Sequence, residues 1–554
     1  MGIYDWLVLT GTIGFILLYG LIKTRKQESL DDYILGEQSS SWWKVGLAVM
    51  ATQASAITFI STTGQGFSDG MQFVQFYLGL PLAMIAICIT FIPMFYKLKV
   101  LTAYEYLEQR FDLRTRTFAS VIFLIQRGLA AGITLYAPSI ILSSIFDWNL
   151  QWTHIISGLV VILYTVTGGS RAVTVTQLQQ MAVILIGMVC IFTYILYSLP
   201  SGVGFTDALT IAGWTGKTEA LSFDLDFNNR YNFWAGITGG FFLALAYFGT
   251  DQSQVQRYIS GKNMTESRMG LIFNGILKIP MQVFILLTGV LLFVVFQFNQ
   301  TPIHFNDKVN ETLRTEHGDQ YSVWMQRNDS LHKALMPDQA EIGNPELKVQ
   351  LEQLNQGRTE LRKDVQDYVR KHLPEQEAND RDYVFLHYIL YYLPTGFIGL
   401  MIAVILSAAM SSISAEINAL TGTTMVDLVK RHFPKWVGSG SEVRWSRWIA
   451  TAWGCSAIGF ALYASLFENL IQFINIIGSL FYGTVLGIFL SGFYLKSVKG
   501  PAVFYSALAA QLTILLLFAF TELGFLWYNV IACAIVMIGS LFLGFLSRLR
   551  GQSS

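Results

Sequence analysis

The stretch "LAVMATQASAITFISTTGQG", residues 47 to 66, places hydroxyl, amide and glycine residues inside an otherwise apolar run. In hydrocarbon every backbone polar group needs a partner, so an irregular helix is tolerated only where it lines a cavity or binds a ligand. The stretch "GITGGFFLALAYFGTDQSQ", residues 236 to 254, has a comparable interruption. Close helix packing through small residues would explain either break alone. The pair of breaks indicates an inverted-repeat transporter with its site near the middle of the membrane.

Composition supports a membrane location for the whole chain. Of 554 residues, 53% are hydrophobic and 13% charged, and most of the sequence falls into apolar runs of roughly 20 residues, which is the length that spans a bilayer. We therefore predict an all-α polytopic membrane protein with about 13 transmembrane helices. The expected spans lie near residues 4–23, 43–66, 72–96, 116–147, 150–168, 172–199, 232–256, 268–298, 393–425, 445–466, 470–495, 501–521 and 525–547.

The spans divide into five regions. These are an extra N-terminal helix with a linker (1–42), a first five-helix repeat (43–199), an outer loop (200–231), a second five-helix repeat (232–495) and two C-terminal helices (496–554). The second repeat contains a polar insertion at 299–392. Within it Leu347, Leu351, Leu354, Leu361 and Val365 recur at helical spacing before Pro374, which predicts an amphipathic helix. This insertion is either a lid or docking surface, or a hairpin packed on its own bundle.

Basic residues set the expected orientation. Lys23, Arg25 and Lys26 follow the first apolar run, and by the positive-inside rule they belong in the cytoplasm. We predict a retained first helix, an N-terminus outside, a cytoplasmic C-terminus and a location in the cell (inner) membrane.

The stretch "ILSAAMSSISAEINALTGTT", residues 405 to 424, adds a row of hydroxyls to another apolar run. An isolated serine in a spanning helix usually bonds the carbonyl four residues earlier. An adjacent pair beside the free carbonyls of a broken helix instead suits a hard monovalent cation, which needs several neutral oxygens. The sequence has no H-E-x-x-H or G-x-S-x-G motif and no cysteine pairs at metal spacing, so enzymatic chemistry is not indicated.

Five stretches together resemble the sodium/solute symporter family, which includes sodium–glucose, sodium/iodide and sodium/monocarboxylate cotransporters. They are "TAYEYLEQRF", "YAPSIIL", "YTVTGGSRAV", "TDQSQVQRYISGKNM" and "SAAMSSISAEIN". The resemblance implies a sodium ion held between the first broken helix and the serine-rich helix. Its ligands would be the backbone carbonyls of Ala51, Ala54 and Ala408 and the hydroxyls of Ser411 and Ser412.

The resemblance also implies a substrate site. Its candidate residues are Gln53, Thr58, Tyr77, Tyr247, Lys278 and Gln472. Tyr77 stands where the sugar transporters have an acid that pairs with the lysine, and an unpaired ammonium in a membrane is costly. Lys278 should therefore face water, a carboxylate or the substrate.

Three further residues are notable. Asp251 and Arg257 could form an ion pair at an inner gate, or lie at a solvated helix end. Glu416 is not typical of the family stretch and receives no role. Gln177 replaces an acid found in members that bind a second cation, which predicts one sodium ion per solute.

We predict a sodium-coupled secondary active symporter that imports a small polar organic solute by alternating access. Sugars or sugar derivatives are the first class considered, and monocarboxylates or other organic anions are the alternative. A membrane sensor built on a transporter bundle is a remote alternative, which the short sequence after residue 547 disfavours. The expected partners are the solute, Na⁺ and the lipid bilayer; nucleic acid is not expected, and the protein is expected to be a monomer.

Overall fold

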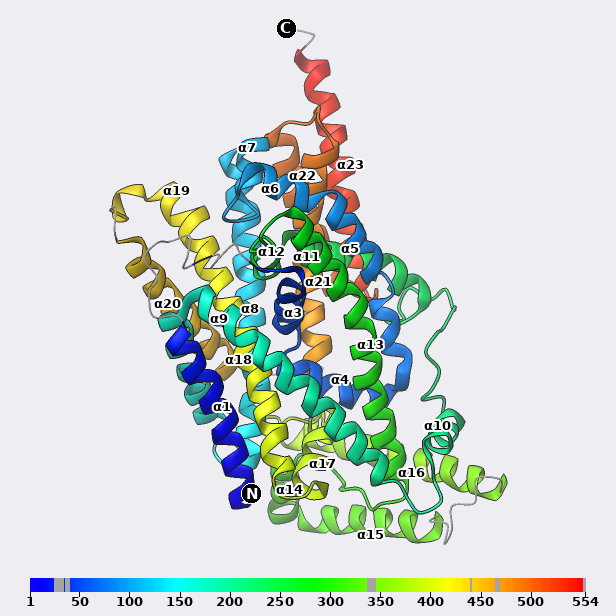
Figure 1. The fold of residues 1–554 in the computed structure, drawn as a ribbon. Helices are drawn as coiled ribbons and strands as arrows, with labels where there is room; N and C mark the ends of the chain where they lie inside the picture. Colours follow the sequence, from blue (N-terminus) through cyan, green and yellow to red (C-terminus); the bar gives the residue numbers. More distant parts are fainter. Residues whose placement is uncertain (24–33, 35–39, 336–344, 439–440, 464–468, 552–554) are drawn as a thin grey trace.

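Long helices form a bundle in the computed structural model, which describes residues 1–554 except 24–33, 35–39, 336–344, 439–440, 464–468 and 552–554. The N-terminus and the short helices α14 and α15 lie at one end of the bundle, and the C-terminus lies at the other (Figure 1). In the described part, eight helices are long and apolar enough to cross a membrane, and three shorter apolar helices accompany them. The all-helical prediction is confirmed.

The first half of the chain contains these elements: α1 (Ile3–Lys23), α3 (Trp42–Gln53), α4 (Ala56–Asp69), the 3-10 helix η1 (Gly70–Tyr77), α5 (Leu80–Ile89), α6 (Phe91–Leu98), α7 (Glu105–Arg110), α8 (Leu113–Phe146), α9 (Leu150–Tyr197) and α10 (Phe205–Trp214). The side chain of Asp112 starts α8 by accepting a hydrogen bond from the Thr115 backbone N–H at 2.8 Å. Such N-caps satisfy one of the donors that a helix start leaves free.

The second half begins with the π-helical turn η2 (Ala235–Gly239), α11 (Gly240–Thr250), α12 (Gln252–Tyr258) and α13 (Met264–Gln297). The polar insertion contributes α14 (Asp307–Glu316), α15 (Gly318–Leu335), α16 (Pro345–His372) and η3 (Arg381–Tyr383). The remaining elements are α17 (Val384–Tyr392), α18 (Phe397–Thr423), η4 (Thr424–Val429), α19 (Lys430–His432), η5 (Pro434–Trp436), α20 (Glu442–Tyr463), α21 (Leu470–Tyr494), α22 (Gly500–Phe520) and α23 (Leu526–Gly551).

One helical element contains two of the predicted spans. The element α9 has 48 residues, and its apolar parts, 150–166 and 173–197, match the spans predicted near 150–168 and 172–199. Of the orienting basic cluster, Arg25 and Lys26 lie outside the described residues.

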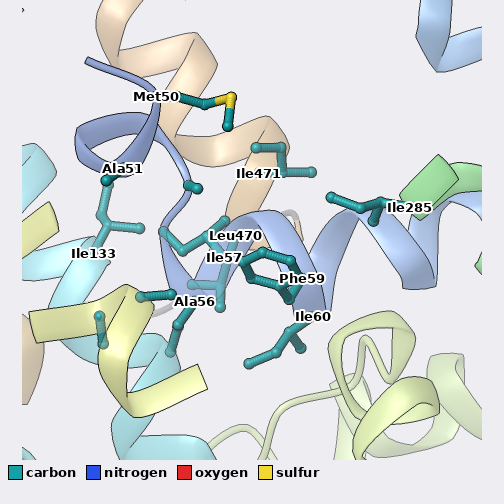
Figure 2. Packing of buried hydrophobic residues seen from close by; sticks show 14 of the residues in the cluster. Met50, Ala51, Ala56, Ile57, Phe59, Ile60, Ile133, Ile285, Leu470 and Ile471 are labelled. Carbon is teal, nitrogen blue, oxygen red and sulfur yellow. The ribbon is translucent and has the colours of Figure 1, made fainter. Parts of the chain in front are cut away.

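Both predicted helix breaks are present. α3 ends at Gln53 and α4 begins at Ala56, with Ala54 and Ser55 outside regular helix. Figure 2 shows the ribbon leaving the helix after Ala51 and turning sharply before Ala56. The second break lies at Asp251, whose backbone is extended between α11 and α12.

Apolar side chains hold the first break in place. Figure 2 shows Ile57 and Ile60 beside the break, with Ile133 of α8 and Ile471 of α21 nearby. All four are less than one-tenth exposed. Burial of such side chains contributes roughly 1.5 to 3 kcal/mol each. The non-helical turn is therefore fixed by the packing around it.

Two glycines let α4 and α13 approach closely. A Cβ atom on Gly66 would collide with the carbonyl of Leu286, and one on Gly289 would collide with the carbonyl of Thr63. Small residues at such crossings allow backbones to touch. The glycines of the first stretch therefore serve helix packing, while the break itself lies earlier, at residues 54–55.

The polar insertion packs on the bundle. The predicted amphipathic helix is α16, and its Leu347, Leu351 and Leu354 join the main apolar core. Farther along, the Arg358 guanidinium donates to the backbone carbonyls of Phe296 at 2.5 Å and Asn299 at 3.1 Å, which satisfies acceptors at the end of α13. These contacts agree with the packed-hairpin interpretation.

Candidate functional site

A cavity of about 140 Å³ lies beside the first helix break. Its walls come from the break between α3 and α4, from α8, α11 and α13, and from α18 and α21. Both broken helices therefore face one space, which is the arrangement that the paired interruptions predicted.

Five of the six predicted substrate residues line this cavity. They are Gln53, Thr58, Tyr77, Tyr247 and Lys278. Gln472, in the first turn of α21, is not among the lining residues. Its neighbours Ile471 and Asn475 line the cavity instead.

Predicted sodium ligands of α3 and α18 are in direct contact. The Ser411 hydroxyl donates to the carbonyl of Ala51 at 2.9 Å, and the Ser412 hydroxyl donates to the carbonyl of Thr52 at 3.1 Å. Ala51, Ala54, Ala408 and Ser411 are fully buried. The broken helix and the serine pair thus bring several neutral oxygens together across α3 and α18, which suits a weakly held monovalent cation.

Lys278 occupies the middle of α13 and is only 3% exposed. Among the described residues, no carboxylate lies within ion-pair distance of its ammonium group. The alternative in which this lysine extends to the membrane surface does not fit, because it lines the central cavity.

Arg127 of α8 is a cavity residue that sequence reasoning missed. Its guanidinium contacts Asp251 and donates to Glu416 Oε1 at 3.1 Å and to the Tyr482 hydroxyl at 2.5 Å. The Tyr482 hydroxyl in turn donates to Asp251 at 2.8 Å. A charged side chain in the apolar run 116–147 was the available signal, because such residues mark functional sites by default.

This network replaces the predicted pair of Asp251 and Arg257. Asp251 pairs with Arg127, whereas Arg257 donates to the Thr174 hydroxyl at 2.9 Å. Glu416, which had no assigned role, lines the cavity and is also a partner of Arg127.

The family model for the sodium:solute symporter family matches residues 33–316 and 369–511. The chain belongs to this family. The unmatched interval, residues 317–368, lies within the polar insertion.

Relatives of this symporter include the sodium-coupled monocarboxylate transporter 2 of Bos taurus, which is 26% identical over 94% of this chain and 73% of that protein. The sodium/sialic acid symporter NanT of Aliivibrio fischeri is 24% identical over 97% of this chain and 92% of that protein. A solved structure of a substrate-bound, outward-open sodium-coupled sialic acid symporter has a TM-score of 0.77 at 22% identity, covering 98% of each chain. The fold is thus the five-plus-five inverted-repeat symporter core.

These findings establish the general activity. The protein is a multi-pass membrane symporter that uses sodium ions, and it is a transporter and not an enzyme.

Polar contacts join helices of the symporter on both sides of the cavity. On the side of the insertion, Asn469 donates to the Gln65 side chain at 2.6 Å, and the Leu470 N–H donates to Asp382 at 3.0 Å. At the opposite end of the bundle, Arg116 joins Asp427 at 2.6 Å and Glu108 at 2.7 Å.

Asp382 makes the insertion-side contact sensitive to pH. This carboxyl is 2% exposed, and burial raises its pKa from 3.8 to about 6. An acid whose pKa is raised by folding destabilises the folded state as pH rises through that interval, here from about 4 to 6. The shift corresponds to at most about 3 kcal/mol at neutral pH.

We expect Asp382→Asn to raise the thermal stability of the detergent-solubilised symporter at pH 7.5 by several degrees, because the amide still accepts from Leu470 N–H without a buried charge. The gain should disappear below pH 4, where both proteins are neutral at this position. Tryptophan-fluorescence melting from pH 4 to 8 measures it, with the exposed Asp367→Asn as control. An equal gain at all pH values would contradict the assigned ionisation.

Proposed function

We propose that this symporter couples sodium entry to the import of a small organic carboxylate. The observation that carries this proposal is the Lys278 ammonium in the wall of the cavity, which has no acidic partner among the residues that the structure describes. An intramembrane cation without a protein partner is costly, and a bound carboxylate would supply the missing partner through a charge-assisted hydrogen bond.

The other charges around the cavity support an anionic solute. Arg127 is matched by Asp251 and Glu416, so with Lys278 the formal charges of these four side chains sum to zero. A bound sodium ion would leave one excess positive charge in a low-dielectric site. A monocarboxylate cancels it, whereas a neutral sugar does not.

The size of the cavity favours a small solute. A protein cavity of about 150 Å³ holds one benzene molecule, which has about six non-hydrogen atoms. The cavity here has a similar volume of about 140 Å³.

The relatives are consistent with the same chemistry. The curated names describe a monocarboxylate transporter and a sialic acid symporter, and both named cargoes are carboxylic acids. The sugar class suggested by the family resemblance is therefore the second candidate.

We assign the roles of the site residues within this proposal. Lys278 binds the carboxylate, and Gln53, Thr58, Tyr77 and Tyr247 form the surrounding wall. The carbonyls of Ala51, Ala54 and Ala408 and the hydroxyls of Ser411 and Ser412 hold sodium, which joins α3 to α18 and favours one state of an alternating-access cycle.

We further propose one sodium ion per solute, because Gln177 carries no charge and its amide donates to the Thr52 hydroxyl at 3.0 Å. All proposed ligands come from one chain, so a monomer suffices. The N-terminus is placed outside and the C-terminus in the cytoplasm of the inner membrane, in agreement with their positions at opposite ends of the bundle (Figure 1).

Uptake into proteoliposomes tests the proposal. We expect a sodium gradient, but not a potassium gradient, to drive uptake of radiolabelled lactate or propionate, and we expect glucose at equal concentration to be transported at least about tenfold more slowly. Sodium-driven glucose uptake without carboxylate uptake would overturn the proposal and favour the sugar class.

A further inference from the structure

A second polar group of the cavity has an unused hydrogen-bonding position. Glu416 lines the cavity and is 5% exposed. Its Oε1 accepts from Arg127 at 3.1 Å and from the Thr134 hydroxyl at 3.4 Å. Its Oε2 has no partner among the described residues. An unsatisfied buried carboxylate oxygen costs free energy that a donor on a ligand would recover.

Neighbouring amides show the same deficit. Within the described part of the chain, the side-chain oxygens of Gln53 and Gln282, both cavity residues, also lack donors. The walls thus offer one ammonium group at Lys278 and several acceptors. A ligand that satisfies both must carry an anionic group and hydrogen-bond donors.

We infer that Glu416 is a specificity-determining residue that recognises a hydroxyl group on the solute, and that the cargo is a small hydroxycarboxylate. This inference rests on the proposed function, since it takes the carboxylate at Lys278 as given. A carboxylate oxygen accepts from a hydroxyl in a charge-assisted bond.

The charge of the cavity separates hydroxycarboxylates from zwitterions. An amino acid would also donate to Glu416 through its ammonium group, but it carries no net charge. The formal charges of Lys278, Arg127, Asp251 and Glu416 sum to zero. With sodium and a zwitterion bound, the site would therefore keep one positive charge without a counter-charge. A hydroxycarboxylate supplies both the donor and the single negative charge.

Matched ligands test the inference without any mutation. Isothermal titration of the full-length protein in sodium-containing detergent buffer compares propionate, lactate and alanine, which differ only in the substituent on carbon 2. We expect lactate to bind about 10- to 100-fold more tightly than propionate, the range for one hydrogen bond to a charged group, and alanine to bind more weakly than lactate.

The variant Glu416→Gln tests whether Glu416 is the residue that distinguishes lactate from propionate. A general change of charge alters the affinities of propionate and lactate alike, so the measured quantity is their ratio, which should fall to about three or less. The surface variant Glu360→Gln, with a side chain 55% exposed, should keep the wild-type ratio.

The outcomes show whether the inference about Glu416 fails alone or the proposed carboxylate transport fails as well. If propionate and lactate bind equally in the wild type, or the ratio persists in folded Glu416→Gln, the inference is overturned while carboxylate transport stands. Tighter binding of alanine than lactate would assign Glu416 to an ammonium group and overturn the hydroxycarboxylate class. If glucose binds with sodium and none of the carboxylates does, the proposed function fails as well.

Discussion

Lys278→Met should weaken solute binding by at least about 30-fold, because truncating one member of a buried charged pair costs roughly 2 to 5 kcal/mol. Methionine keeps most of the side-chain volume of lysine, so the wall of α13 is preserved. Sodium binding measured without solute should change by less than about threefold. Calorimetric titration with lactate and with sodium chloride separates the two effects.

A surface substitution provides the matched control. Lys363 lies exposed on α16, and Lys363→Met should leave both affinities unchanged. If Lys278→Met bound lactate as the wild type does, the carboxylate would have to bind elsewhere. Equal losses of lactate and sodium binding would instead indicate that Lys278 only supports the fold.

Ser411→Ala and Ser412→Ala should each raise the sodium concentration for half-maximal uptake by about tenfold, because each removes one oxygen ligand worth roughly 1 to 2 kcal/mol. The double variant should lose sodium activation almost entirely. The loss of folded protein should be small, since each hydroxyl makes one hydrogen bond to a carbonyl. Sodium-dependent uptake in proteoliposomes and size-exclusion profiles measure the two quantities.

Ser414 serves as the internal control for this series. It lies on the same helix, but its hydroxyl bonds the carbonyl of Met410 in its own helix at 2.5 Å. Ser414→Ala should therefore retain wild-type sodium dependence. Unchanged sodium dependence in both Ser411→Ala and Ser412→Ala would show that the ion is held by other groups.

The fold was largely predictable because membrane spans depend on local composition. Apolar runs of sufficient length and polar interruptions inside two of them are visible in the sequence without any tertiary information. The two spans within α9 were predictable from the same signal, because a short polar stretch with a glycine pair separates their apolar parts.

The site was predictable where a helix break or a row of hydroxyls marked it. The positions of Ala51, Ser411 and Ser412 follow from such signals and from the family resemblance. The network of Arg127 could not be derived in this way, because its partners Asp251 and Glu416 lie 124 and 289 positions away in the sequence. Only the packing of α8 against α18 and beside the break between α11 and α12 determines which of these charged side chains pair.

The balanced charges around the cavity bear on the energy available for transport. One sodium ion and one monocarboxylate cross the membrane with no net electrical current, so the membrane voltage neither drives nor opposes the step. A neutral cargo would gain about 2.3 kcal/mol per 100 mV from the accompanying ion. Without that term, a tenfold sodium gradient supplies only about 1.4 kcal/mol and supports about tenfold accumulation. A cell using this protein would depend on rapid consumption of the imported acid to sustain its inward flow.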